Sequence, residues 1–136
     1  MHIDGGCHCG YLKYEAEVDP EAVSICHCTD CQTLSGTAYR TVVPAKKDSF
    51  KLLTGQPKIY VKTAESGNKR AQGFCPDCGT HIYATSATDP QIYGLRVGTT
   101  RQRAQLRPKK QGWCQSALGW AMNIESLPQS PKQRPS

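Results

Sequence analysis

The sequence has no apolar run approaching the ~18 residues of a membrane span, so we expect no transmembrane helix. Residues 1–6 carry neither a basic stretch nor an apolar core, so we expect no secretory signal and a cytoplasmic location with reduced thiols. Aromatic residues make up only 7% and apolar residues only 38% of the 136 positions. One small domain with such a thin core needs a further source of stability, and a bound metal is one such source.

Acidic residues are nearly absent from the second part of the chain. Residues 90–136 carry eight lysines and arginines but only Glu125 as an acid, whereas residues 1–89 carry nine basic and ten acidic residues. This basic surface is either a solvated face or a site for anionic partners such as a carboxylate-bearing small molecule. Residues 101–110 could bind nucleic acid, but no RNA-binding aromatic motif or recognition-helix pattern accompanies them, so we do not expect that function.

Long helical patterns are also missing, and short alternating segments between turns take their place. Only residues 99–106 and the segment after Cys28 indicate a helical turn or two. The pattern therefore indicates a mainly β fold over residues 1–128, in which Pro44 closes one strand. Residues 129–136 lack periodicity and predict a disordered tail. The predicted strands cover residues 12–18, 38–43, 50–53, 58–62, 80–84, 91–97 and 117–124.

Cysteine is abundant, and seven of the eight cysteines fall in three tight clusters. A disulfide framework is one interpretation of eight cysteines in a small domain. Thiols two or three residues apart in a reducing compartment favour a metal instead, because they crowd on one side of a loop. The clusters are Cys7-His8-Cys9, Cys26-His27-Cys28-Thr29-Asp30-Cys31 and Cys75-Pro76-Asp77-Cys78, and Cys114 stands alone.

The first and last clusters can each direct two sulfurs at one metal ion. In Cys-x-x-Cys the chain turns back on itself, and in Cys-x-Cys on extended backbone residues i and i+2 share a face. Zinc closes a structural site with four ligands. Cys7, Cys9, Cys75 and Cys78 therefore predict a zinc that fastens the N-terminal segment to the middle of the chain.

Cys26, Cys28 and Cys31 remain, and three thiolates do not complete a tetrahedron. Three protein ligands with an exchangeable fourth position is the arrangement of catalytic zinc, and an all-sulfur site favours an incoming thiolate. The alternative is a second closed structural site that a nearby side chain completes. The candidates for that fourth ligand are His27, His8, Asp30 and Cys114.

Three longer motifs surround the cysteine clusters. They are Gly6-Cys7-His8-Cys9-Gly10, then Cys26-His27-Cys28-x-x-Cys31 followed by Ser35-Gly36, and finally Phe74-Cys75-x-x-Cys78-Gly79-Thr80. Together they resemble the signature of the glutathione-dependent formaldehyde-activating enzyme family. Further matches lie at Gly98-Thr99, Pro108, Trp120 and Leu127-Pro128, so the resemblance spans residues 5–128.

The resemblance implies a β-tent fold, built from coiled sheets of short antiparallel strands. It also implies two zinc ions, a structural one on Cys7, Cys9, Cys75 and Cys78 and a catalytic one on Cys26, Cys28 and Cys31. The implied activity is that of a carbon–sulfur lyase, which joins formaldehyde to glutathione to give S-hydroxymethylglutathione. The implied partner is thus a small-molecule thiol, and a homodimer is an open option.

Two positions depart from the family pattern. Gln32 follows Cys31 where the family often has arginine, and Thr100-Arg101-Gln102-Arg103 stands where acidic residues are frequent. Both changes could alter which anionic or thiol ligand binds. The second function class is a non-catalytic zinc-binding module for protein or other ligands, and the fourth ligand of the second zinc would discriminate between the two classes.

Other side chains could assist such a site, although each has a simpler explanation. Arg40, Arg70, Arg96 and Arg101 could pair with substrate carboxylates, but an isolated arginine is more often a surface residue. His27 and His81 are the nearest proton donors by sequence, but a histidine beside metal ligands more often packs or supports them. We expect Cys114, which stands beside Trp113, to be a buried apolar residue.

Overall fold

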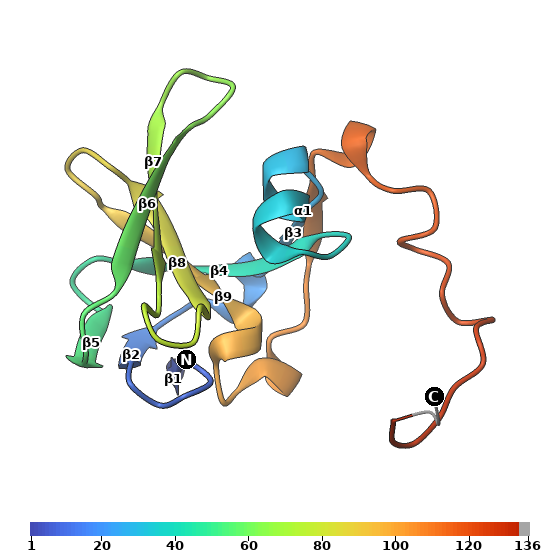
Figure 1. Ribbon diagram of the computed structural model, residues 1–136, viewed down its shortest axis with the longest axis horizontal. Helices are drawn as coiled ribbons and strands as arrows, with labels where there is room; N and C mark the ends of the chain where they lie inside the picture. Colours follow the sequence, from blue (N-terminus) through green and yellow to red (C-terminus); the bar gives the residue numbers. More distant parts are fainter. Residues whose placement is uncertain (134–136) are drawn as a thin grey trace.

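The computed structural model describes residues 1–133 and shows a mainly β chain (Figure 1). The predicted fold class is thereby confirmed. The only α-helix in the described range is α1 (Thr29–Ser35), and short 3-10 turns lie at η1 (Pro20–Ala22), η2 (Val97–Thr99), η3 (Arg103–Gln105) and η4 (Cys114–Ser116). The strands are β1 (His2–Gly6), β2 (Lys13–Glu17), β3 (Ser24–Cys26), β4 (Arg40–Lys46), β5 (Lys51–Thr54), β6 (Lys58–Thr63), β7 (Lys69–Phe74), β8 (His81–Ser86), β9 (Ile92–Arg96) and β10 (Lys110–Gly112).

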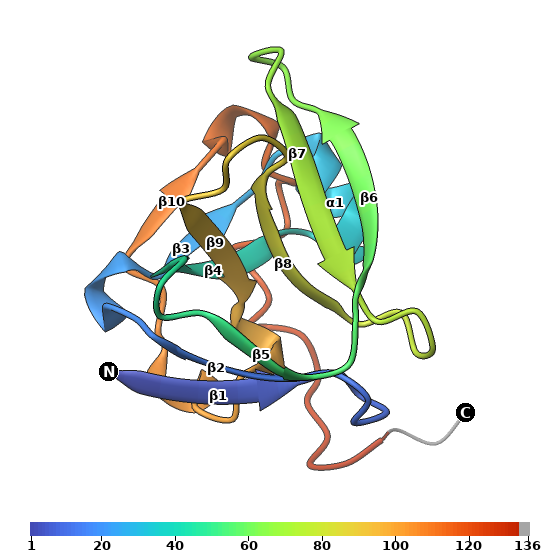
Figure 2. The same cartoon turned by 90° about the vertical axis from the view of Figure 1, so that its left-hand side faces the viewer.

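A small antiparallel sheet has the strand order β1-β2-β5. The alternation predicted for residues 12–18 is confirmed, since Tyr14 and Ala16 are buried while Lys13 and Glu17 are exposed. In both ribbon views this sheet lies at one end of the molecule, below the larger sheet (Figure 1 and Figure 2).

A larger sheet has the order β10-β3-β4-β9-β8-β7-β6. Neighbouring strands run antiparallel except β10 and β3, which run parallel. The hairpin of β6 and β7 projects at the end of the molecule opposite the small sheet (Figure 2). Gly73 of β7 lies against the ring of Tyr83 on β8, where a Cβ atom would come within 2.4 Å of the ring, so only glycine fits there.

The core lies between the two sheets and depends on a few aromatic rings. The ring of Phe50 lies 5.7 Å from Tyr14, 5.5 Å from Tyr83 and 4.8 Å from Tyr93, measured between centroids. Aliphatic residues of both sheets complete the cluster, among them Ile3 and Leu95, which are fully buried. This core fixes the relative position of the two sheets, and therefore of the loops that carry the cysteines.

Several strand predictions differ from the structure. The patterns missed β1, β3, β7 and β10. Strands β3 and β10 have only three residues each, β1 has a single buried residue and ends in two glycines, and β7 has Gln72 and Gly73 at buried positions. Pro44 does not close β4, which runs on to Lys46. Since β3 pairs only with residues 40–42 of β4, the missing N–H of Pro44 removes no hydrogen bond to β3.

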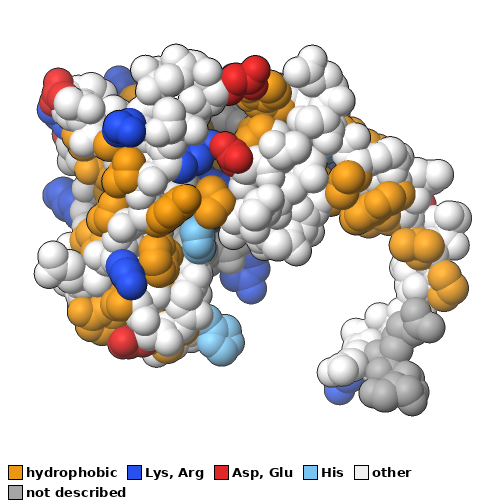
Figure 3. Space-filling model, turned by 45° about the horizontal axis from the view of Figure 1, so that its top comes forward, with side chains coloured by type: hydrophobic (Ala, Val, Ile, Leu, Met, Phe, Trp, Pro, Cys, Tyr) orange, Lys and Arg blue, Asp and Glu red, His pale blue; other side chains and the backbone are white. Residues whose placement is uncertain are grey.

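The strand predicted over residues 117–124 is wrong, since these residues form turns and irregular backbone and pair with no strand. The C-terminal segment runs apart from the sheets (Figure 1), and hydrophobic side chains lie along it (Figure 3). In residues 1–133, no helix is long and apolar enough to cross a membrane. The disordered tail predicted for residues 129–136 stays a prediction, and residues 134–136 lie outside the described part. The exposed apolar residues of the segment are Leu118, Trp120, Met122, Ile124 and Leu127.

Candidate metal centres

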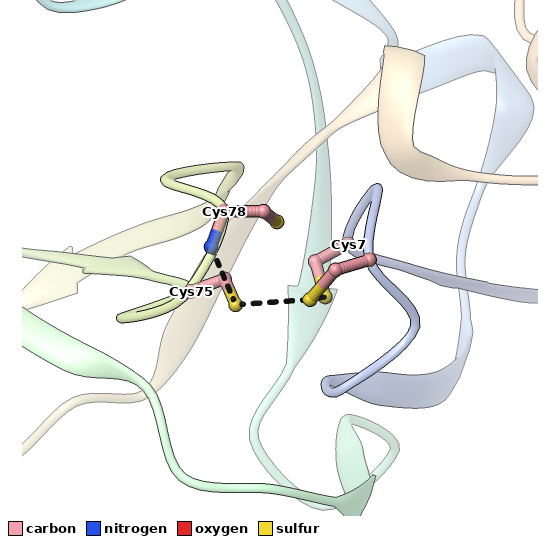
Figure 4. Close-up of side chains that lie close together, drawn as sticks. Cys7, Cys75 and Cys78 are labelled. Atoms are coloured by element: carbon pink, nitrogen blue, oxygen red, sulfur yellow. Dashed lines mark hydrogen bonds between the residues drawn. The ribbon is translucent and has the colours of Figure 1, made fainter.

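The first centre joins two loops from different sheets. Cys7 and Cys9 lie on the turn after β1, and Cys75 and Cys78 lie on the turn between β7 and β8 (Figure 4). The four Sγ atoms lie within 4.8 Å of one another, with Cys7–Cys9 at 3.6 Å and Cys9–Cys75 at 3.8 Å. A tetrahedron with Zn–S bonds of ~2.3 Å has edges of about 3.8 Å. The four thiols therefore fit a zinc ion, as the spacing predicts.

Backbone N–H groups point at the sulfurs of this four-cysteine cluster. Leu12 donates to Cys7 Sγ at 3.1 Å, and Cys78 donates to Cys75 Sγ at 3.5 Å. The hydroxyl of Thr80 lies 3.2 Å from Cys78 Sγ, and this hydrogen bond is the first cause that lowers the pKa of the Cys78 thiol to about 5. Gly79 has a φ of +79°, which turns the chain back after Cys78. The loops thus stabilise the thiolate at Cys78, whereas desolvation and hydrogen bonds with the other three thiols raise the pKa of Cys9 to about 12.

The second centre is local in the chain. Cys26 ends β3, Cys28 caps the N-terminus of α1, and Cys31 lies in the first turn of that helix. Their Sγ atoms also lie within 4.8 Å of one another. The N–H of Cys31 donates to Cys28 Sγ at 3.2 Å, and Gly36 ends the helix in a left-handed conformation. Short as it is, α1 brings the third sulfur back to the first two.

Proton sharing and a nearby cation favour negative charge on this three-cysteine cluster. The pKa of the Cys26 thiol is lowered to about 5, first by its hydrogen bond with Cys31, and Arg40 contributes further. The pKa of Cys31 is raised because the pair shares a proton. Arg40 is the residue of β4 that pairs with Cys26 of β3, so the cation lies beside the cluster. All three side chains are half-buried, a partly accessible setting for a metal.

The candidate fourth ligands lie elsewhere. Across residues 1–133, no further His, Cys, Asp or Glu joins the three sulfurs within the same 4.8 Å. His27 instead bonds Gln111 Oε1 through Nε2 at 2.8 Å, and Asp30 forms an ion pair with Lys62 at 2.8 Å. Cys114 is exposed, so the expectation that it is buried is wrong: it belongs to η4 at the surface, outside the core.

A pocket of about 360 Å³ opens beside Cys28. Lys62 on β6 and Trp113 before η4 lie on its walls, so three distant parts of the chain meet there. Its lining residues are Cys28, Thr29, Asp30, Lys62, Ala64, Glu65, Trp113, Gln115 and Ser116. A small ligand in this pocket would reach the three-cysteine cluster from the side of Cys28.

The C-terminal segment holds the three-cysteine loop in place. Gln32 Nε2 donates to the carbonyl of His27 at 2.9 Å and to that of Ser116 at 3.0 Å. The hydroxyl of Ser116 also donates to the carbonyl of His27, at 2.9 Å. Gln32, where the family pattern often has arginine, is therefore a link between α1 and the segment around η4.

Two of the four candidate arginines are not surface residues. Arg40 and Arg96 are buried, with exposures of 7% and 8%, because they lie on the paired strands β4 and β9 inside the larger sheet. Arg101 is exposed and forms an ion pair with Asp4 at 2.9 Å. The preference for surface positions is thus wrong for Arg40 and Arg96. Gln72, which contacts both buried arginines, was missed because no local pattern distinguishes it.

Comparison with known proteins gives the same family as the motifs. The family model described as glutathione-dependent formaldehyde-activating enzyme matches residues 2–116. The chain belongs to this family, so the resemblance stated from the sequence is confirmed. Membership indicates an enzyme of the formaldehyde-activating kind or a related one, and both cysteine clusters could hold zinc.

A solved structure also shares the fold. The crystal structure of a Rhodobacter sphaeroides protein, a structural genomics target, superposes with a TM-score of 0.62 at 19% sequence identity. The match covers 79% of this chain and 98% of that one. At this identity the likeness concerns the fold alone.

Proposed function

We propose that the chain is a zinc-dependent carbon–sulfur lyase-type enzyme that joins a small thiol, glutathione or a relative, to formaldehyde or a related carbonyl. The observation that carries the proposal is the three-cysteine cluster, whose sulfurs have a pocket beside them and no fourth ligand in residues 1–133. Family membership supports the thiol and the carbonyl as substrates.

The two centres would have different roles. The four thiols of Cys7, Cys9, Cys75 and Cys78 suit a closed structural zinc, which joins two loops. The three thiols of the second cluster suit a zinc that keeps one position for a substrate sulfur. A zinc ion bound there lowers the pKa of a thiol that reaches it, so that the thiol is held as thiolate at neutral pH.

The residues around the pocket would position the substrate. Trp113 offers an apolar wall, and the ion pair of Lys62 with Asp30 connects β6 to the first turn of α1. Both place the carbonyl compound close to a sulfur held beside Cys28. Proximity of this kind converts an encounter of two molecules into a reaction within one complex.

The bond changes balance without any redox step. The substrate sulfur forms a bond to the carbonyl carbon while the π pair of the C=O bond moves to oxygen. The thiol gives up one proton and the new alkoxide takes up one, so that thiol plus formaldehyde equals the S-hydroxymethyl product. These protons exchange with water at the mouth of the pocket, where exposed Asp30 and Glu65 lie.

The test compares Cys28→Ser with Cys114→Ser in zinc-loaded protein. Because formaldehyde and thiols also combine without a catalyst, the readout is the rate of exchange of ¹³C between formaldehyde hydrate and the glutathione adduct, measured by exchange NMR. The wild type and Cys114→Ser should accelerate this exchange equally, since Cys114 is exposed and outside both clusters. In Cys28→Ser the acceleration should fall by at least ~10- to 100-fold, because removing even a residue that only supports a metal ligand has an effect of that size.

A wild-type protein that holds two zinc ions but does not accelerate the exchange would refute the proposed activity. That result would favour the binding-module alternative. Equal losses in Cys28→Ser and Cys114→Ser would show that the effect does not arise at the three-cysteine cluster.

A further inference from the structure

Two buried cations in the larger sheet have no carboxylate side chain to pair with. Arg40 and Arg96 are more than nine-tenths buried, and neither has a carboxylate oxygen within 4.0 Å among the described residues. A buried charge is costly unless a partner compensates it. The fold therefore maintains positive charge at a place where it provides no balancing acid.

A neutral amide holds the two guanidinium groups together. Gln72 Oε1 accepts from Arg40 Nη1 at 3.3 Å and from Arg96 Nη2 at 2.9 Å. Arg40 Nη2 and Arg96 Nε, both buried, have no hydrogen-bond partner at all. Because such orphaned donors cost free energy, their retention points to a ligand that accepts from these groups.

Both arginines line a cavity of about 400 Å³. Hydroxyl groups and a histidine provide further donors on its walls, whereas no Asp or Glu lines it. Burial, and then Arg40, lower the pKa of His81, so its neutral ring can donate or accept a hydrogen bond near pH 7. The full lining is Leu34, Ser35, Thr37, Tyr39, Arg40, Thr41, Gly79, His81, Arg96 and Gly98.

Neighbours of both cysteine clusters line the cavity. Gly79 on its wall follows Cys78 of the four-cysteine cluster, and Arg40 on its wall pairs in the sheet with Cys26 of the three-cysteine cluster. Arg40 also helps to balance the thiolates of Cys26 and Cys31. Arg96 has no such neighbour, so it is the cation that most needs an anion.

We infer that this cavity is a carboxylate-binding subsite, in which Arg96 and Arg40 hold a carboxylate of the thiol substrate while its sulfur lies at the three-cysteine cluster. Arginine forks match the planar carboxylate, and donors in a dry cavity bind it more strongly than surface donors do. The identity of the thiol rests on the proposed function, whereas carboxylate binding rests on the cavity alone.

The experiment uses ligands that separate the carboxylates from the thiol. Zinc-loaded, ¹⁵N-labelled protein is titrated with S-methylglutathione, whose thiol is blocked, and with its diester, whose carboxylates are blocked. The Arg96 Nε–H resonance should shift on addition of S-methylglutathione. The diester should produce the same shift only at a concentration about tenfold higher or more. Neither probe can bind as a thiolate, so failure of the thiol chemistry would not affect this readout.

Variants identify the site. Arg96→Gln should lower the affinity for S-methylglutathione about tenfold or more. Arg96→Lys should retain part of the affinity that Arg96→Gln loses, and Arg107→Gln should leave the affinity unchanged. Arg107 is exposed, so it controls for loss of one positive charge.

Equal binding of the two probes to the wild type would overturn the inference, and this comparison holds even if Arg96→Gln does not fold. Unchanged affinity in a folded Arg96→Gln would also overturn it. Inorganic phosphate that shifts the Arg96 resonance at lower concentration than S-methylglutathione would overturn the assignment to a substrate carboxylate.

Discussion

Gln72 holds together the two arginines that line the cavity of the proposed carboxylate subsite. Its side chain is 1% exposed and accepts hydrogen bonds from Arg40 and Arg96, yet it contributes no negative charge. Glutamate at this position would have almost the same shape and would neutralise one of the two cations. A single atom, amide nitrogen against carboxylate oxygen, thus decides whether both cations or only one of them lack a compensating charge on this side chain.

At this residue we predict opposite effects on stability and on ligand binding. Gln72→Glu should raise the free energy of unfolding by roughly 1–3 kcal/mol, because buried guanidinium groups gain a charged acceptor. It should also weaken the binding of S-methylglutathione, because the carboxylate of the ligand would then meet a site with one fewer net positive charge. Urea unfolding and the NMR titration measure the two effects.

Gln105→Glu on the exposed η3 turn is the matched control, with the same chemical change and no contact to the cavity. A loss of stability in Gln72→Glu would mean that the two arginines are already balanced in the folded protein. That outcome would contradict the interpretation of the cavity as an unfilled anion site.

Single residues also show where prediction from sequence reached its limit. The grouping of all seven clustered cysteines was predictable, because Cys-x-Cys and Cys-x-x-Cys direct sulfurs by local backbone geometry. The burial of Arg40 and Arg96 was not, because it depends on how β4 and β9 pair in the sheet. Nothing local to Gln72 indicates that two distant guanidinium groups will meet it.

Among the elements, α1 has the largest effect on the second centre. This helix has seven residues and no buried side chain, so core packing contributes little to its position. Its attachment depends instead on Gln32, which bonds the carbonyls of His27 and Ser116. The element that supplies Cys31 is therefore fixed by polar contacts to the segment around η4.

Gln32→Ala should loosen the second centre without changing the first. With both hydrogen bonds lost, one of the two zinc ions should be released to a chromogenic chelator about tenfold faster. This is the lower end of the effect that residues supporting the metal ligands have on metal binding. The other zinc should leave at the wild-type rate. Gln105→Ala serves as the control, and parallel acceleration of both zinc ions would contradict the assigned local role.

The strands show a similar division. Strands with clear alternation, such as β2 and β6, were predicted with small errors at their ends. The β7 strand was missed although it has a neighbouring strand on each side, because Gln72 and Gly73 occupy positions where a core strand normally carries apolar residues. Those two positions serve the arginines and the ring of Tyr83, and both partners lie on other strands.

At the scale of the whole molecule, the four-cysteine cluster joins the small sheet to the large one. Cys9 and Cys75 are 66 positions apart, whereas Cys26, Cys28 and Cys31 lie within one short segment. A metal that links distant positions removes more freedom from the unfolded chain than one that links neighbours. The two centres should therefore differ in their effect on stability.

Cys75→Ser should destabilise the zinc-loaded protein more than Cys31→Ser. The difference in loop closure alone is about 2 kcal/mol, which corresponds to roughly 5–10 °C in the thermal midpoint for a domain of this size. Circular dichroism melting curves measure it, with Cys114→Ser as the reference for loss of a thiol. Equal midpoints for Cys75→Ser and Cys31→Ser would contradict the structural role of the first centre.

The sequence by itself determined the mainly β fold, the family and the partition of the cysteines into four and three, because alternation and ligand spacing act over a few residues. Only the tertiary structure decided that residues 117–124 form turns, that Cys114 is exposed, and that Arg40 and Arg96 meet at Gln72 and line one cavity. Burial depends on which strands become neighbours, and that choice is made by the whole core rather than by any local segment.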